Sequence, residues 1–405
     1  MSQDIFVARQ PIFDRGKHVV GYELLFRSSL SNVFSHHDQD QASIQMMDTT
    51  LLGFGLDSLV GKVPGYFNVT RDVLIRELYA ALPKDRAVIE VLESVEPDEE
   101  VIAACRAVKR SGYRLALDDF VLRADYEPLI ALADTIKVDF LATKGATRGV
   151  VAGQFIPRGI ELLAEKVETH ADFEEASELG YTLFQGYFFC KPEMLSGKDI
   201  PSVKSTCLRF IQELHRPELD YDRLEAVIKS EVSLSVKLLR YLNSAGFGWR
   251  HEVTTIRQAL RILGERPMKK WASLVALTLL GDDKPVELVV TSMVRAQFCE
   301  QIGLAGALPG READLFLAGL LSTLDALLDR PMEDVLSQMA VPADIRSTLL
   351  GEPTRLSQIL ALAIAYDRGD WVRVSTIAKS VGVAERTLPE LYRESIEWVM
   401  KILDG

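Results

Sequence analysis

The chain has 405 residues, of which 48% are hydrophobic and 26% are charged, and its formal net charge is −12. These values are ordinary for a soluble globular protein, and the length allows two domains with separate cores. A net negative charge argues against a general nucleic-acid binder, because phosphate backbones are held by basic surfaces, so we expect no DNA partner.

The chain shows no sign of export or membrane insertion. Its N-terminal sequence MSQDIFVARQPIF lacks the basic start and long apolar core of a signal peptide. The longest apolar run, WASLVALTLLG, is too short to span a bilayer and predicts a buried helix. The cysteines have no C-x-x-C spacing, which indicates free thiols in a reducing compartment. We therefore expect a cytoplasmic protein without a membrane segment.

The first half alternates short β-branched segments with amphipathic helical stretches. The turn sequence at 14–16 (DRG) lies between two apolar runs and predicts a hairpin, which would make the first strand antiparallel to the second. A helix is predicted in DEEVIAACRAVKRSG, because this segment begins at an acidic cap and ends at Gly112.

Seven short apolar segments of the first half end in a carboxylate, an amide or a lysine. Their roughly regular spacing favours parallel strands side by side, as in a (β/α)8 barrel, whose active site is built from the C-terminal strand ends. Oxygen ligands that converge at one rim repel each other unless cations lie among them, and such donors suit Mg2+ or Mn2+. A pair of these ions is the usual device for phosphodiester hydrolysis. The polar residues concerned are Glu23, Asn68, Glu90, Glu93, Asp118, Asp119, Lys137, Glu165, Glu168 and Gln185.

The strand pattern stops after the segment YFFCKP. The sequence MLSGKDIPS that follows contains glycine, proline and serine, so we place a domain boundary at residue 197, with one domain over 1–197 and the other over 198–405. Beyond it, segments such as VELVVTSMVRAQFCEQIG and READLFLAGLLSTLDALL carry helical spacing of apolar residues. The second half is therefore predicted to be an all-α domain.

The first half resembles the EAL domain, the cyclic di-GMP phosphodiesterase and receptor domain of bacteria. In the family's order, the matching segments are ARQPIFD, YELLFR, YFNVT, IEVLES, LALDDF, IKVD, AEKVET and FQGYFFCKP. The resemblance implies an α/β fold, a TIM-type (β/α)8 barrel with an antiparallel first strand. It also implies metal-dependent hydrolysis of cyclic di-GMP to pGpG.

The same resemblance assigns the metal ligands. Glu23, Asn68, Glu90 and Asp118 would hold the first Mg2+ or Mn2+, and Asp118 and Asp119 would bridge to the second.

The resemblance also assigns the catalytic and nucleotide-binding residues. Glu165 would be a metal ligand or general base, and Lys137 would orient the attacking water. Gln10, Arg27 and Gln185 match positions that contact the dinucleotide, and a guanidinium suits phosphate because it offers two charged donors.

Two departures from the family pattern concern the second metal. After LALDDF the chain continues as VLRADYEPL, without the glycines that permit positive φ in the family's GTGYSSL loop, and Lys166 replaces a glycine in AEKVET. Two functions therefore stay open: a slow or regulated phosphodiesterase, and an inactive cyclic di-GMP receptor or scaffold. Dimerisation stays open too, because the family's loop contributes to dimer contacts.

The second half resembles the HDOD domain, a relative of the HD hydrolases that lacks their metal-binding residues. The resemblance lies in SLSVKLLRYLNSAGFG and TTIRQALRILGERPMKKW. The sequence GLLSTLDAL places Ser322 and Thr323 where an HD hydrolase has histidine and aspartate, and no histidine occurs after His251. Without such ligands a two-metal site cannot form. The second domain is therefore expected to be non-catalytic and to bind a protein partner that the sequence does not identify.

Overall fold

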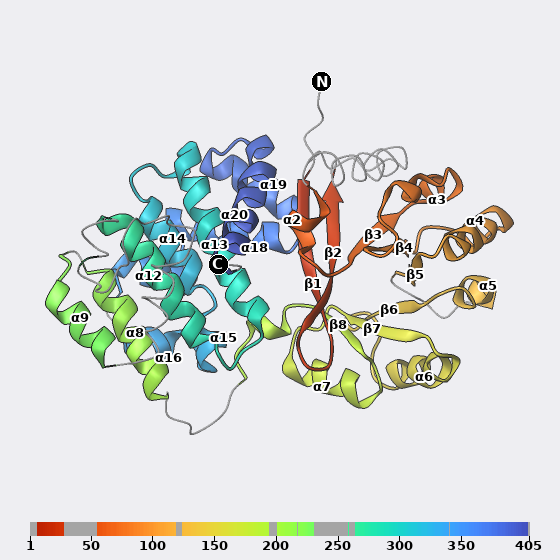
Figure 1. The fold of residues 1–405 in the computed structure, drawn as a ribbon, viewed down its shortest axis with the longest axis horizontal. Coiled ribbons are helices and arrows are strands. Elements are labelled where there is room, and N and C mark those ends of the chain that lie inside the picture. Colours follow the sequence, from red (N-terminus) through yellow and green to blue (C-terminus); the bar gives the residue numbers. More distant parts are fainter. Residues whose placement is uncertain are drawn as a thin grey trace. The chain divides into compact units, whose positions relative to one another are not determined.

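A computed structural model describes residues 6–27, 55–118, 124–193, 201–216, 218–230, 258, 264–339 and 341–403. The chain forms two compact units (Figure 1). The first consists of Met1–Phe189, Ala365–Thr376 and Ala384–Arg393, and the second of Cys190–Ile364, Ile377–Val383 and Glu394–Gly405. The predicted domain boundary at residue 197 lies outside the described residues. Across the described part of the chain, no helix is both long and apolar enough to cross a membrane.

The first unit contains a closed barrel whose eight strands follow one another in chain order. The strands are β1 (Phe6–Phe13), β2 (Val19–Arg27), β3 (Gly65–Val69), β4 (Ala87–Val91), β5 (Arg114–Leu117), β6 (Thr135–Asp139), β7 (Glu161–Glu165) and β8 (Leu183–Gln185). Strand β1 is antiparallel to both β2 and β8, whereas the pairs from β2–β3 to β7–β8 are parallel. The predicted barrel with an antiparallel first strand is confirmed.

The β1–β2 hairpin turns where the sequence predicted it. The amide of Asp14 donates to the carbonyl of His18 at 2.9 Å, and the amide of Lys17 donates back to the carbonyl of Asp14 at 3.0 Å. Lys17 has a φ of 60°, a left-handed conformation that closes the turn. The hairpin makes β1 run against β2, so β1 enters the barrel in reverse.

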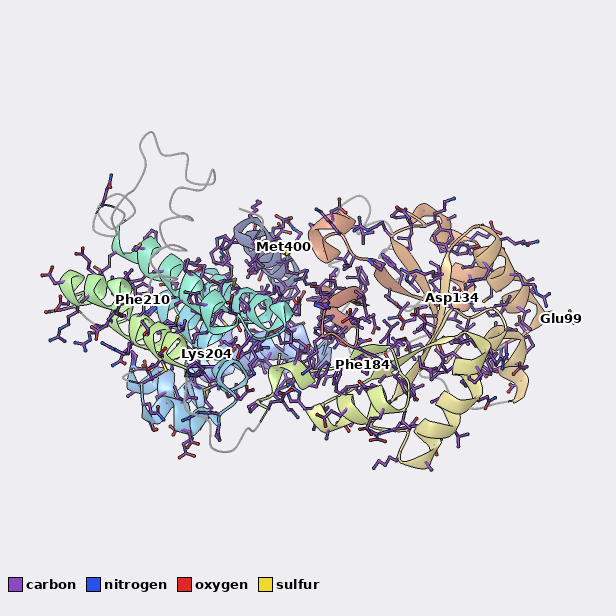
Figure 2. All side chains as sticks on the ribbon, turned by 60° about the horizontal axis from the view of Figure 1, so that its bottom comes forward. Glu99, Asp134, Phe184, Lys204, Phe210 and Met400 are labelled. Atoms are coloured by element: carbon purple, nitrogen blue, oxygen red, sulfur yellow. The ribbon has the colours of Figure 1, made fainter. Side chains whose placement is uncertain are left out.

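The crossover segments between the strands carry short helices. They are α2 (Leu56–Val60), α3 (Arg71–Ile75), α4 (Glu99–Arg110), α5 (Glu127–Ile130), α6 (Ala146–Phe155) and α7 (His170–Glu178). Helix α4 confirms its predicted limits: the Asp98 carboxylate accepts the amide of Val101 at 2.9 Å, and Gly112 follows with a φ of 90°. Figure 2 labels Glu99 at the start of α4 and Asp134 just before β6.

An apolar layer fills the inside of the barrel. It is made of Ile12, Tyr66, Val88, Ala116, Leu163 and Leu183, which are all buried and come from six different strands. Because side chains alternate along a strand, the residue two positions further on faces the same side. The residues two positions after each member of this layer therefore also point into the barrel.

The second unit is helical throughout its described residues. Its helices are α8 (Ser202–Leu214), α9 (Tyr221–Lys229), α12 (Glu265–Leu280), α13 (Val286–Ile302), a π-helix (Gly303–Ala307), α14 (Glu312–Leu321), α15 (Leu324–Leu328), α16 (Met332–Ser337) and α17 (Ala343–Leu349). Three more, α18 (Arg355–Asp367), α19 (Trp371–Val381) and α20 (Leu388–Leu403), contribute residues to both units. The predicted all-α second half is confirmed for these residues.

Close backbone packing stabilises the helical unit. A Cβ added at Gly319 of α14 would lie 2.6 Å from the Cα of Ala296 on α13, so only glycine allows this approach. On α8, which Figure 2 labels at Lys204 and Phe210, the Phe210 ring is fully buried. The Lys204 ammonium donates to the carbonyl of Leu327 at 2.8 Å. These contacts join α13 to α14 and α8 to α15.

Candidate active site

The polar residues singled out from the sequence lie on the same face of the strands as the apolar layer. Five polar residues each stand two positions after an apolar residue of that layer. The sixth, Lys137, stands two positions after the equivalent residue of its own strand, β6. The strand period of two therefore turns their side chains into the barrel, at the C-terminal end of each parallel strand. These residues are Asn68, Glu90, Asp118, Lys137, Glu165 and Gln185.

Lys137 stands among four carboxylates. Its Nζ lies 2.6 Å from Glu165 Oε1, 3.0 Å from Asp118 Oδ1 and 3.2 Å from Glu23 Oε2, and it also pairs with Glu90 Oε1. The side chain of Lys137 is 1% exposed and that of Glu90 is fully buried. One ammonium balances one carboxylate, so three negative charges stay in excess when all four acids are ionised. Such an excess is unfavourable in a buried site without a further cation or bound protons.

The pKa values of Glu90, Glu165 and Lys137 are shifted at this site. Burial raises the pKa of Glu90 well above its usual value, and Lys137 offsets only part of that rise. Burial likewise raises the pKa of Glu165 to about 8, again with Lys137 acting in the opposite direction. Burial acts to lower the pKa of Lys137, but the surrounding carboxylates outweigh it and raise this pKa well above its usual value. Lys137 is therefore charged, and Glu90 and Glu165 tend to hold protons.

Three buried oxygens at this rim lack a hydrogen-bond partner. They are Glu90 Oε2, Asn68 Oδ1 and Gln185 Oε1. Asn68 Nδ2 donates to Glu23 Oε1 at 3.0 Å, which leaves its carbonyl oxygen without a donor. A buried polar atom left unsatisfied costs about 1–3 kcal/mol, and a hard divalent cation satisfies oxygen donors of this kind.

The oxygen donors at this rim are therefore of the kind that a divalent cation prefers. In the structure the four carboxylates are arranged around the ammonium of Lys137. Among the described residues, no three His, Cys, Asp or Glu side chains are arranged as a ready metal site. The Nζ of Lys137 stands between the carboxylates that would be ligands.

A chain of amides lies beside the carboxylates. Gln185 Nε2 donates to Glu23 Oε2 at 2.6 Å and to Gln10 Oε1 at 2.9 Å. Gln10 Nε2 in turn donates to the backbone carbonyl of Arg368 at 3.2 Å. The structure thus brings Gln10 and Gln185, which the family resemblance assigned to the nucleotide, into contact with each other and with Glu23.

Two further predicted residues are only partly described. Arg27 ends β2 opposite Phe6, but nothing of its side chain is described. Asp119 lies outside the described residues, as do Val121–Arg123 of the loop that was expected to limit the second metal.

The structure adds a contact that sequence reasoning missed. Lys166 has a φ of 53° in the place of the family's glycine, and its Nζ donates to Asp139 Oδ2 at 2.6 Å. Burial alone would raise the pKa of Asp139, but this hydrogen bond and two from backbone amides lower it. Asp139 ends the strand that carries Lys137, so its place in the segment IKVD was the signal available. Lys166 therefore takes up the left-handed backbone of the glycine and adds an ion pair beside the rim.

Comparison with known proteins gives matches over most of the chain. The EAL domain model matches residues 67–192 and the HDOD domain model matches residues 200–343. The protein YuxH of Bacillus subtilis is 31% identical over 409 residues, which cover 99% of each chain. The cyclic di-GMP phosphodiesterase CdgJ of Vibrio cholerae is 32% identical over 403 residues, which cover 98% of this chain and 93% of CdgJ.

Two solved structures each match just under half of the chain. The phosphodiesterase PaMucR, in complex with c-di-GMP, is 17% identical with a TM-score of 0.39, over 46% of this chain and 95% of its own. Klebsiella pneumoniae BlrP1, with manganese and c-di-GMP, is 26% identical with a TM-score of 0.36, over 46% of this chain and 56% of its own. YuxH and CdgJ are 31% and 32% identical to this chain over almost its whole length. This chain therefore belongs to the family of EAL–HDOD proteins that includes them.

Proposed function

We propose that the barrel is a metal-dependent phosphodiesterase that hydrolyses cyclic di-GMP to pGpG, slowly or under regulation. The observation that carries the proposal is the buried group of four carboxylates around Lys137, with Glu90 Oε2 left without a partner. The relative CdgJ, which is named as a cyclic di-GMP phosphodiesterase, supports the choice of substrate.

The proposed ligands of the first Mg2+ or Mn2+ are Glu23, Asn68, Glu90 and Asp118, and Asp118 and Asp119 would bridge to a second ion. When bound, such an ion polarises the phosphate and lowers the pKa of a bound water. The chain's own contribution is a buried set of oxygen donors at one end of a closed barrel. Because the ionised carboxylates carry more negative charge than Lys137 balances, the site favours the binding of cations.

Lys137 and Glu165 are the proposed catalytic residues. Lys137 keeps its charge because the carboxylates raise its pKa, so it can hold a water or phosphate oxygen by donating to it. Glu165 has a pKa of about 8 in the metal-free site, close to the pH at which a general base works best. It can therefore take a proton from a water near its carboxylate, or bind the metal when ionised.

Gln10, Arg27 and Gln185 are the proposed contacts to the dinucleotide. Gln10 and Gln185 already share a hydrogen bond, so their remaining donors and acceptors are held in fixed directions beside the carboxylates. The guanidinium of Arg27 would bind a phosphate through two donors.

A cyclic di-GMP receptor or scaffold is the second candidate. The observation that favours it is that Lys137 already contacts every carboxylate of the cluster, so the site holds an internal counter-charge without a metal. In such a protein the nucleotide would bind at Gln10, Arg27 and Gln185, and no product would form.

We propose that the helical unit is a non-catalytic domain that binds a protein partner. Ser322 and Thr323, which replace the metal ligands of a hydrolase, are tied into hydrogen bonds: Ser322 Oγ accepts from Arg295 Nη1 at 2.9 Å, and Thr323 bonds Ser292. A guanidinium and hydroxyl groups offer a divalent cation no anionic ligand.

Product formation by the purified chain tests the function. Cyclic di-GMP is incubated with the protein and Mn2+ or Mg2+, and pGpG is measured by chromatography. Glu165→Gln should lower the rate by about a hundredfold, the usual worth of a general base. Glu161→Gln is the matched control, because Glu161 is exposed at the other end of the same strand. Nucleotide binding without pGpG would favour the receptor, and the absence of both would refute the proposal.

A further inference from the structure

A turn near the C-terminus lies against the amide chain of the barrel. Asp367 is the last residue of α18, and Arg368 and Gly369 lead on towards α19; all three belong to the same compact unit as the barrel. The Arg368 carbonyl accepts from Gln10 Nε2 at 3.2 Å, and the Asp367 carbonyl accepts from the hydroxyl of Tyr187 at 2.7 Å. One carbonyl therefore accepts from a proposed nucleotide contact, Gln10, and the other from Tyr187, which lies two residues after Gln185.

This turn falls outside both family matches. The HDOD match ends at residue 343 and the EAL match at residue 192. Neither match assigns a role to Asp367, Arg368 or Gly369.

Steric contacts fix the position of the turn. Gly369 has a φ of +66°, and a Cβ added there would lie 2.7 Å from Leu25 Cδ1 on β2. The Arg368 guanidinium lies over the Tyr187 ring, 4.9 Å from its centroid. On the α19 side, the Trp371 ring packs on Phe6 of β1, with their centroids 6.0 Å apart. The turn therefore cannot shift without breaking contacts with β1, β2 and the segment after β8.

Two buried tyrosines, Tyr366 and Tyr392, pack next to the same segment. The Tyr366 ring packs against Trp371 at 5.2 Å and against Tyr392 of α20 at 4.7 Å between centroids. Both tyrosines are buried, and burial raises their pKa, so their hydroxyls stay neutral at physiological pH. This aromatic group holds the turn on the barrel without bringing a charge near the site.

The hydrogen bond to Arg368 decides which way the Gln10 amide faces. A side-chain amide has one carbonyl oxygen and one NH2 group, and a flipped amide would place its oxygen against the oxygen of the Arg368 carbonyl. With Nε2 directed at Arg368, Gln10 presents Oε1 to Gln185. Gln185 then directs its own Nε2 at both Gln10 and Glu23. One backbone carbonyl thus orients two amides and one carboxylate of the site.

We infer that the turn Asp367–Gly369 is a positioning element of the barrel site, which sets the orientation of Gln10 and Gln185 through the carbonyl of Arg368. The inference rests on the proposed function, in which these two glutamines contact cyclic di-GMP. It adds that nucleotide affinity depends on a segment of the chain more than 170 residues after β8.

The test displaces the turn by adding a single methyl group. Gly369→Ala places a Cβ against Leu25 and imposes an unfavourable φ on alanine. We expect the Kd or KM for cyclic di-GMP to rise about fivefold, equal to the loss of one ordinary hydrogen bond, with kcat changed less than KM. The matched control is Gly382→Ala, because Gly382 has a φ of +79° and no atom within 4 Å of the added Cβ.

A rescue separates positioning from general destabilisation. Leu25→Ala removes the atom that the new methyl group would meet, so the double variant Leu25→Ala, Gly369→Ala should regain nucleotide affinity. Its free energy of unfolding should nevertheless fall further, because Leu25→Ala loses apolar contacts. Tyr187→Phe, which deletes only the hydroxyl on the Asp367 carbonyl, gives the same readout if Gly369→Ala does not fold.

The outcomes separate this inference from the proposed function. Wild-type affinity in both Gly369→Ala and Tyr187→Phe would overturn the inference alone. An equal loss in Gly369→Ala and Gly382→Ala would also overturn it, because backbone strain would then explain the effect. A wild-type protein that neither binds nor hydrolyses cyclic di-GMP would overturn the proposed function, and the inference with it.

Discussion

Replacing Lys137 with methionine removes the ammonium that contacts Glu23, Glu90, Asp118 and Glu165. Methionine keeps most of the side-chain volume, so the change is mainly one of charge. Removing one partner of a buried ion pair destabilises a protein by about 3–5 kcal/mol. We expect a loss in this range for metal-free Lys137→Met at pH 8.

The loss should depend on pH in a defined direction. Lys137 lowers the pKa of both Glu90 and Glu165, so its removal raises these pKa values further. A carboxyl whose pKa in the folded state lies above its unfolded value binds more protons when folded, so its contribution to stability is lost as pH rises. The variant should therefore be closest to wild type near pH 5 and furthest from it at pH 8. Each such group contributes a slope of up to about 1.4 kcal/mol per pH unit.

The assay is urea unfolding with EDTA, followed by far-UV circular dichroism between pH 5 and pH 8. The transitions of the two compact units are fitted separately, because a single free energy does not describe a chain of two units. Excess Mn2+ should restore part of the stability at pH 8, since a cation then replaces the ammonium. Lys109→Met is the control: Lys109 pairs with Asp134 at a partly exposed site, so its loss should cost at most about 1 kcal/mol. A pH-independent loss in Lys137→Met would refute the reasoning.

Three other outcomes are expected. Metal analysis of the full chain should find Mn2+ in the wild type and none in Glu23→Ala, because the variant removes a proposed ligand and the helical unit is expected to hold no metal. Retained Mn2+ would contradict one of these two expectations. Replacing residues 121–128 with the family's glycine-containing loop should raise kcat more than affinity, by on the order of a hundredfold if it restores the second metal; a change in binding alone would argue against that role. Burial lowers the pKa of His215, which bonds Ser273, to about 4. Because this value lies below the unfolded one, the helical unit should lose up to about 3 kcal/mol as the pH falls from 6.5 to 4, and His215→Gln should abolish this dependence; an unchanged pH profile would show that another group titrates.

The barrel and the inward direction of its rim residues could be predicted from the sequence alone. The reason is local: a strand repeats every two residues, so Asn68 must share a face with Tyr66, and Glu90 with Val88. The hairpin after β1 and the limits of α4 were predictable for the same kind of reason, because turn and cap residues act on their immediate neighbours. The helical second half followed from apolar spacing that no strand could satisfy.

The contacts within the site were decided only by the tertiary structure. The sequence predicted that acids gather at one rim, but not that the Nζ of Lys137 would touch four of them while one oxygen of Glu90 stays without a partner. Side-chain reach and burial depend on how the barrel closes, which no single strand determines.

The turn Asp367–Gly369 shows the same limit over a longer distance. Gly369 on its own indicates a left-handed turn after a helix, because only glycine adopts such a backbone without strain. Nothing in the sequence around Gly369 predicts a contact with Gln10, which lies 358 residues earlier in the chain than Arg368. The local sequence permits a left-handed turn at Gly369, and tertiary packing alone decided that the Arg368 carbonyl accepts a hydrogen bond from the barrel site.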